Sequence, residues 1–155
     1  SQPKGVFYPL QTFSVGKQID FLEIPFCIEA ERKSDERILV EIANSLSRKV
    51  YLVNSTQRQS LHLAAVFANN FSNHIFSIAE NILEEAKLPF ELLHPLLRET
   101  AEKAISIGAS AAQTGPAKRQ DEAVIKKQIN SLNEKPNWQS LYQMMSKLIQ
   151  EKYQQ

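Results

Sequence analysis

The segment from Ser55 to Lys87 constrains the fold of this chain more than any other. It contains neither proline nor glycine, and its apolar residues recur at alternating steps of three and four, the spacing of one face of an α-helix. At 1.5 Å per residue, such a helix spans roughly 45–50 Å and is longer than most helices of globular proteins. The segment therefore predicts one long helix with apolar positions at Leu61, Ala64, Ala68, Phe71, Ile75, Ile78, Ile82 and Ala86.

The first half of this predicted helix is apolar around most of its circumference, which is typical of a helix that is buried on several sides. One narrow polar line interrupts that surface, and it consists of Arg58, His62, Asn69, Asn70, Asn73 and Ser77. Amides on a buried helix need hydrogen-bond partners. The line is therefore either the wall of a substrate pocket, or a helix end near solvent followed by amides that bond to neighbouring backbone.

Size and charge limit the classes of function. The chain has 155 residues, which suits one domain, or one small domain with a piece of another. Its 18 basic and 17 acidic residues give a net charge of +1, which does not favour binding to nucleic acid or an anionic membrane. The lack of a long apolar run and of a signal peptide predicts a cytoplasmic protein. Cys27 has no cysteine to pair with, and we interpret it as a small buried strand residue.

The first third of the chain predicts strands and one helix. Gly5–Tyr8, Pro25–Ala30 and Val50–Val53 have the composition of strands. A helix is expected between the last two strands, with Ser34 or Asp35 as its cap. Strand, helix and strand in this order normally form a parallel, right-handed crossover. Three strands and one helix leave one sheet face poorly covered, so this segment is predicted to be the end of a larger α/β domain.

The remainder of the chain predicts a bundle of about four helices, counting the long one. Pro95 is expected to kink the second helix or to lie in its first turn, and Gly108 is expected to end it. Asp121 is a candidate cap for the next helix. Pro136 should end that helix, and Asn137 is a candidate cap for the last one.

Standard catalytic motifs do not occur in this sequence. The three histidines include no HExxH pair and the cysteine has no thiol partner, so no metal site is expected. No GxSxG, GxGxxG or P-loop motif occurs, so any nucleotide would depend on residues outside this chain. The stretch Thr114–Asp121 is either an interhelical loop with a capping aspartate, or a loop and helix start that holds an anionic group.

Three stretches of the sequence resemble one bacterial family: Tyr8–Ser14, Arg58–Phe71 and Thr114–Asp121. The family comprises Rossmann-type oxidoreductase-like proteins with a C-terminal helical domain of unknown function. It belongs to the wider superfamily of 6-phosphogluconate, 3-hydroxyisobutyrate and prephenate dehydrogenases and pyrroline-5-carboxylate reductase. The resemblance covers nearly the whole chain, with the motifs in the family's order and spacing.

The resemblance implies a fold class and an activity. Residues 1–54 would be an α/β fragment, the last three strands and one helix of a Rossmann-like dinucleotide-binding domain. Residues 55–155 would be an all-α helical bundle built on one long helix, which provides dimerisation and the substrate pocket. NAD(P) would be held mainly by a Gly-rich half that this chain lacks, so the chain alone is expected to be inactive. The implied function is that of an NAD(P)-dependent oxidoreductase acting on a small carbonyl, imine or hydroxy-acid substrate; the alternative is a non-catalytic dimerisation or ligand-binding module.

The resemblance also implies roles for individual residues. They are catalytic for His62 and Asn70, substrate-binding for Arg58, Asn73, Thr114, Gly115 and Arg119, and cofactor-binding for Tyr8, Pro9 and Gln11. The sequence departs from the hydroxyacid dehydrogenases at Val66, where those enzymes have a catalytic lysine three residues before an asparagine pair. Valine cannot transfer a proton, whereas the imidazole of His62 can do so near neutral pH. The expected partners are a second copy of the chain and a small-molecule substrate, with no nucleic acid, membrane or metal.

Overall fold

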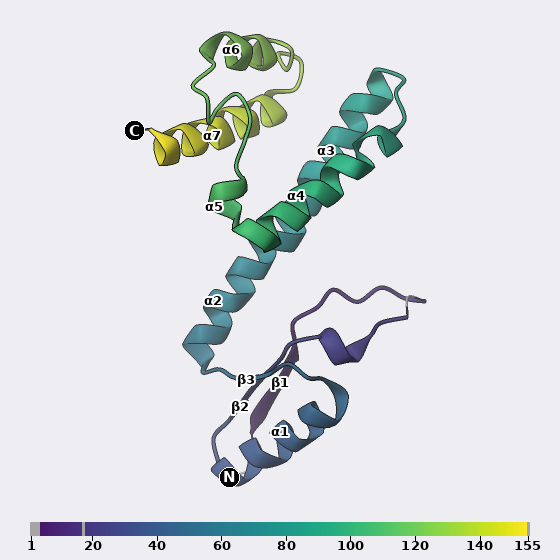
Figure 1. Cartoon of the computed structure of the whole chain (residues 1–155), viewed down its shortest axis with the longest axis vertical. Coiled ribbons are helices and arrows are strands. Elements are labelled where there is room, and N and C mark those ends of the chain that lie inside the picture. Colours follow the sequence, from purple (N-terminus) through teal and green to yellow (C-terminus); the bar gives the residue numbers. More distant parts are fainter. Residues whose placement is uncertain (1–3, 17, 155) are drawn as a thin grey trace. The chain divides into compact units, whose positions relative to one another are not determined.

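The computed structural model describes residues 4–16 and 18–154, and the chain divides into two compact units, Ser1–Asn73 and His74–Gln155 (Figure 1). The described strands all lie in the first unit, and the described part of the second unit contains helices and turns. This arrangement confirms the expected fold class, an α/β fragment followed by helices. The assignment of residues 1–54 and 55–155 to two functional domains stays a prediction.

The sheet of the first unit has three strands, β1 (Gly5–Pro9), β2 (Phe26–Ala30) and β3 (Val50–Leu52), in the order β1-β2-β3. β1 is antiparallel to β2, and β2 is parallel to β3. Helix α1 (Lys33–Leu46) connects the two parallel strands, as the crossover pattern predicts. The short 3₁₀ helix η1 (Phe21–Glu23) precedes β2.

The predicted side-chain cap of α1 is wrong. The extended residue that precedes the helix is Arg32, with φ −111° and ψ 139°, and it makes no side-chain cap bond. Ser34 and Asp35 already lie inside the first turn, whereas a capping residue must have non-helical backbone.

The core of the first unit lies between the sheet and α1. Its fully buried members are Ile24, Phe26, Ile28 and Ala43, each at most 2% exposed. Because side chains alternate along a strand, Phe26 and Ile28 share one face of β2, and Cys27 and Glu29 share the other. Cys27 is 2% exposed, which confirms its interpretation as a buried strand residue.

The long helix forms as predicted, but its middle is not α-helical. It consists of α2 (Ser55–Ala65), the π-helical segment η2 (Val66–Phe71) and α3 (Ser72–Glu85). Asn54 caps its start in a capping box, in which Asn54 and Gln57 each bond to the other's backbone N–H. The hydroxyl of Ser72, the first residue of α3, donates to the carbonyl of Phe67 in the π segment at 3.2 Å.

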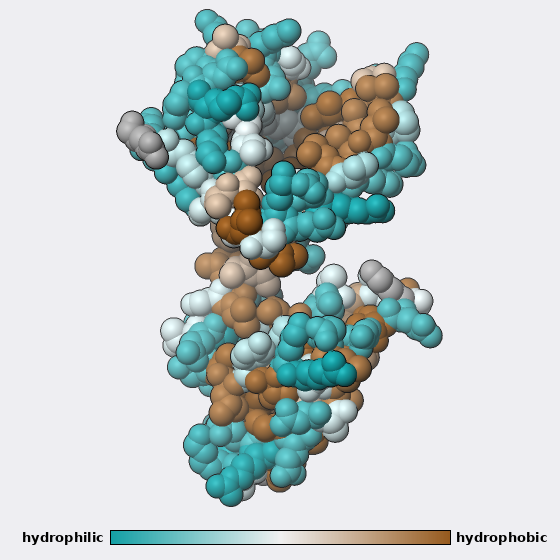
Figure 2. Space-filling view, in the orientation of Figure 1, coloured by the Kyte–Doolittle hydropathy of each residue, from teal (hydrophilic) through white to brown (hydrophobic). Residues whose placement is uncertain are grey.

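The expectation that the first half of this helix is buried on several sides is wrong. No residue of α2 or η2 is buried, and Leu63 and Phe67 are 60% and 62% exposed. Figure 2 shows apolar surface over this part of the helix. The physical reason is that apolar periodicity marks a surface that avoids water, but does not say whether the same chain covers it.

In the second unit, Pro95 lies in the first turn of its helix, and Gly108 ends that helix with φ +84°, as predicted. Asp121 accepts a hydrogen bond from the backbone N–H of Val124 at 3.2 Å, so its predicted capping role is confirmed. The predicted cap at Asn137 is wrong, because Pro136 already begins the last helix. The elements are η3 (Phe90–Leu93), α4 (His94–Ile107), α5 (Ala109–Ala112), α6 (Glu122–Asn130) and α7 (Pro136–Tyr153).

Candidate functional site

The start of α2 is attached to β2 through Glu29. The Ser55 hydroxyl donates to Glu29 Oε1 at 2.8 Å, and the Arg58 guanidinium forms an ion pair with Glu29 Oε2. The side chains of Arg58 and Glu29 are only 27% and 26% exposed. Arg58 is thus engaged by a carboxylate of its own chain, and its predicted binding of substrate stays a prediction.

One turn further along α2, His62 lies next to Tyr8. The Tyr8 hydroxyl is 3.4 Å from His62 Nδ1, a long hydrogen bond that joins the C-terminal half of β1 to the helix. The Glu29–Arg58 pair lies one helical turn before this contact, because Arg58 and His62 are four residues apart on α2. Two predicted site residues from distant parts of the sequence are therefore brought together.

Two hollows meet at this Tyr8–His62 contact, and Val66 lines both. The larger, which we call the amide hollow, has a volume of about 630 Å³. The residues that line both hollows are Tyr8, His62 and Val66. The amide hollow is further lined by the polar residues Gln11, Thr12, Asn69 and Asn70 and the apolar residues Leu10, Phe13, Ala65 and Ala68. The smaller, which we call the apolar hollow, has a volume of about 540 Å³ and is further lined by Val6, Phe7, Arg58, Gln59 and Leu63.

The π segment determines which asparagines line the amide hollow. A regular α-helix turns by about 100° per residue, which would place Asn69 and Asn73 on the side of His62. A π turn closes on the fifth residue instead of the fourth and so adds one residue to the turn. This addition brings Asn70 to the side of His62 and turns Asn73 away. Asn70 accordingly lines the hollow beside Asn69, whereas Asn73 does not.

The amide hollow is polar without being charged. None of its described lining residues is an aspartate, glutamate, lysine or arginine. The side-chain oxygen of Gln11 accepts a bond from the backbone N–H of Thr12 at 2.8 Å, which leaves the NH₂ group of Gln11 as a donor. Within residues 4–16 and 18–154, the side-chain amides of Asn69 and Asn70 have no hydrogen-bond partner. The hollow therefore offers neutral donors and acceptors beside the imidazole of His62.

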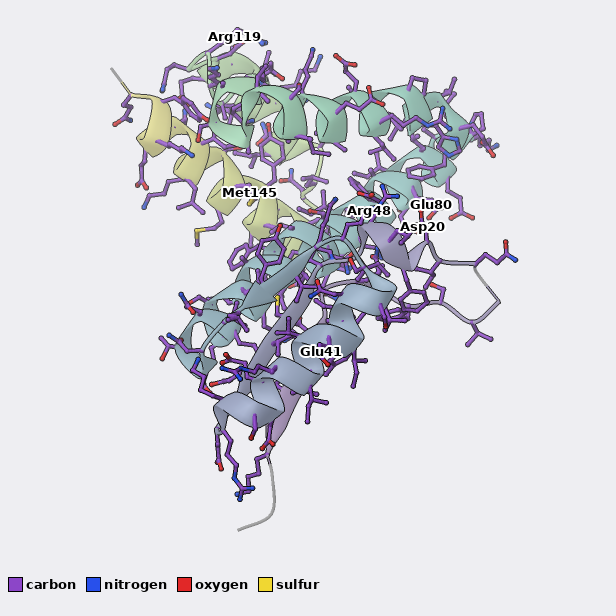
Figure 3. The ribbon with its side chains drawn as sticks, turned by 60° about the horizontal axis from the view of Figure 1, so that its bottom comes forward. Asp20, Glu41, Arg48, Glu80, Arg119 and Met145 are labelled. Atoms are coloured by element: carbon purple, nitrogen blue, oxygen red, sulfur yellow. The ribbon has the colours of Figure 1, made fainter. Side chains whose placement is uncertain are left out.

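The other predicted site residues lie elsewhere. Pro9 does not line either hollow, and its carbonyl accepts a bond from the Gln11 backbone N–H at 3.1 Å, which shapes the turn after β1. Thr114, Gly115 and Arg119 belong to the second unit, in the turns that precede α6. Gly115 has φ +103°, and Figure 3 shows Arg119 on the outside of its turn. The roles of these four residues in binding stay predictions.

The sequence predicts no individual role for Thr12 or Phe13, which line the amide hollow, and no positive role for Val66. Thr12 and Phe13 belong to the stretch that carries the family resemblance, which was a usable signal. Val66 lies at the centre of the site as a shared wall of both hollows. Across the part of the chain that the structure describes, no three His, Cys, Asp or Glu side chains gather to hold a metal ion. The helices described there are all too short or too polar to cross a membrane.

Comparisons with known proteins agree with this fold. A family model described as a domain of unknown function, DUF2520, matches residues 24–149. A solved structure from Bacteroides fragilis, named a putative NADP oxidoreductase, is 47% identical with a TM-score of 0.93, and the match covers 97% of this chain and 58% of that one. A Thermotoga maritima protein is 25% identical with a TM-score of 0.81, covering 96% of this chain and 61% of its own. The chain thus spans about three fifths of the length of these solved relatives. No curated protein matches it.

Proposed function

The chain belongs to the DUF2520 family, and we propose that it is the C-terminal portion of an NAD(P)-dependent oxidoreductase for a small carbonyl, imine or hydroxy-acid substrate. The observation that carries this proposal is the contact between Tyr8 and His62 beside the amide hollow. A proton-transfer group next to unpaired amides is what a site needs to orient a polar substrate and protonate it. The name of the Bacteroides fragilis relative supports the same class of reaction.

The residues of this chain fit one end of a dinucleotide. The end of β1 offers the aromatic ring of Tyr8 and the amide of Gln11, which suit a flat nicotinamide ring with its carboxamide. The sequence has no glycine-rich turn for the phosphates, so residues outside the chain would have to hold them. When bound, NAD(P) supplies a hydride donor or acceptor.

The chain's own residues would handle the substrate. His62 gives a proton to the substrate oxygen or nitrogen during reduction, or takes it during oxidation. Asn70 donates a hydrogen bond that holds this oxygen or nitrogen in place. Val66 excludes water from one wall, because its side chain has no group that binds water.

The test is an activity assay on the complete encoded protein. NADPH and a panel of small carbonyl compounds are added, and NADPH oxidation is measured as the loss of its absorbance. Replacing His62→Gln should lower kcat by about 10²–10⁴-fold, the usual contribution of a general acid or base. The matched control is His74→Gln, an exposed histidine that lines neither hollow. Equal rates for the two variants would contradict the role of His62, and a complete protein that binds no dinucleotide would refute the proposal.

A second candidate function is a non-catalytic dimerisation or ligand-binding module. It is favoured by the exposed apolar residues Leu63, Phe67 and Phe71, which are 60%, 62% and 49% exposed. Such a strip suits an interface with a second copy of the chain, which we propose as its partner. Sedimentation velocity of the complete encoded protein should then show a dimer that Phe67→Lys dissociates, whereas Asn44→Lys, at an exposed residue of α1, should leave the dimer intact. A monomer at high concentration would count against this candidate.

A further inference from the structure

We infer that the substrate of this site is an uncharged molecule with a polar, amide-like arm and a hydrocarbon arm on either side of its reacting group. The arms would occupy the amide hollow and the apolar hollow. The position of the reacting group rests on the proposed function, and the polarity of the two arms rests on the hollows themselves. The inference narrows the carbonyl, imine and hydroxy-acid classes to uncharged carbonyl or imine compounds.

The two hollows can hold one molecule because they share a wall. Tyr8, His62 and Val66 line both, so a molecule that passes this point contacts both sets of residues. Their volumes of about 630 and 540 Å³ are each within the range of small-molecule sites. The reacting group of the molecule would lie at the shared wall, beside the imidazole of His62.

The amide hollow selects a neutral polar arm. Asn69 and Asn70 each present an NH₂ donor and a carbonyl acceptor. A carboxamide pairs with such groups through both its oxygen and its NH₂. A carboxylate can only accept, so it pairs with the amide NH₂ groups alone and offers no donor to the amide oxygens of the exposed Asn69 and Asn70.

The charges around the two hollows also favour an uncharged arm over a carboxylate. A carboxylate that enters the amide hollow loses water and meets no described cationic side chain in return. The guanidinium of Arg58 lies at the apolar hollow, but Glu29 neutralises it. An anionic arm is therefore disfavoured in both hollows.

The apolar hollow selects the hydrocarbon arm. Val6, Leu63 and Val66 supply aliphatic surface, and Tyr8 adds an aromatic ring. Burying an aliphatic or phenyl group against these side chains removes apolar surface from water, which is favourable. Val66 is the residue that makes the shared wall apolar.

The experiment compares 2-oxo-4-phenylbutanamide with 2-oxo-4-phenylbutanoate, which have the same carbon skeleton and differ only in amide against carboxylate. Each compound is titrated into the complete encoded protein, labelled with ¹⁵N and free of cofactor, at about pH 8, where histidine is ordinarily neutral. The amide should bind at least about tenfold more tightly, equivalent to about 1.4 kcal/mol. Shifted signals should include the side-chain NH₂ groups of Asn69 and Asn70. Equal binding, tighter binding of the carboxylate, or no binding of either would overturn the inference.

Variants test the cause of the preference. Val66→Lys places a cation at the shared wall and should abolish or reverse the preference for the amide. Ser60→Lys adds the same charge on the same helix, at a residue that lines neither hollow, and should leave the preference unchanged. If Val66→Lys fails to fold, Val66→Ala replaces it and should weaken both probes equally, because it removes hydrocarbon contacts alone. Unequal weakening by Val66→Ala, or a preference unchanged in folded Val66→Lys, would overturn the inference.

The proposed function can fail separately. These titrations contain no dinucleotide, so a preference for the amide in a protein that never oxidises NADPH would refute the oxidoreductase and keep the uncharged ligand. NADPH oxidation that requires a carboxylate substrate would support the oxidoreductase and refute the uncharged ligand.

Discussion

The attachment of α2 to the sheet through Glu29 gives a prediction whose size can be worked out from the structure. Glu29→Gln keeps the shape of the side chain but removes its charge, and leaves the Arg58 guanidinium without its counter-charge. Exposed ion pairs contribute about 0–1 kcal/mol, and breaking a fully buried pair costs about 3–5 kcal/mol. The side chains of this pair are about one quarter exposed, and Glu29 also accepts the Ser55 hydroxyl. We expect the free energy of unfolding to fall by about 2 kcal/mol, within the range for hydrogen bonds to charged groups.

The assay is urea unfolding, monitored by circular dichroism. The matched control is Glu23→Gln, because Glu23 also forms an ion pair, with Lys49 at 2.7 Å, but their side chains are 59% and 43% exposed. The hydrogen bond and charge of Lys49 lower the pKa of Glu23, so this pair contributes stability above the carboxyl pKa of the unfolded chain and loses it as the pH falls through the folded value. Because this pair is exposed to water, the change in unfolding free energy caused by Glu23→Gln should be too small to resolve at neutral pH. Equal effects of the two variants would refute the assignment of Glu29 as an anchor for α2.

Three further predictions concern the first unit. Ile28→Ala should cost about 3–4 kcal/mol of unfolding free energy because Ile28 is completely buried, whereas Ile38→Ala, at a residue 55% exposed, should cost under about 0.5 kcal/mol; similar costs would mean that the core is misplaced. Burial raises the pKa of the Cys27 thiol, so as the pH rises the thiol ionises at a lower pH in the unfolded chain than in the folded chain, and its stabilising contribution is lost above the unfolded pKa. A thiol reagent should therefore label the folded chain at least about tenfold more slowly than the urea-unfolded chain, and equal rates would contradict the burial of Cys27. Asn54→Ala should cost about 1 kcal/mol by removing the capping box of α2, measured by thermal unfolding, and no change would show that the cap does not hold this helix end.

Local patterns in the sequence were sufficient to predict the strands and the longer helices. The three strands, the parallel crossover and the long helix follow from apolar periodicity and from the positions of proline and glycine. Caps were predicted correctly where the capping residue lies just outside the helix, as at Asp121. They were wrong where a polar residue such as Ser34 is already within the first turn.

The composition of the site was harder to predict because it depends on contacts between residues far apart in the sequence. Arg58 pairs with Glu29, 29 positions earlier, and no local pattern announces that ion pair. The π turn has no residue signature of its own, so the helix was expected to be regular, and Asn73 was placed on the same side as His62. The exposure of Leu63 and Phe67 could not be distinguished from burial, because periodicity reports the polarity of a surface and not its partner.

The most direct test of the central claim is a titration of the complete encoded protein with NADPH, in which binding is monitored by the fluorescence of the reduced nicotinamide. The account predicts saturable binding to the wild type, equal binding to His62→Gln, and no saturation with residues 1–155 alone. A complete protein that shows no saturable binding of NADPH or NADH would contradict the assignment of this chain to an oxidoreductase.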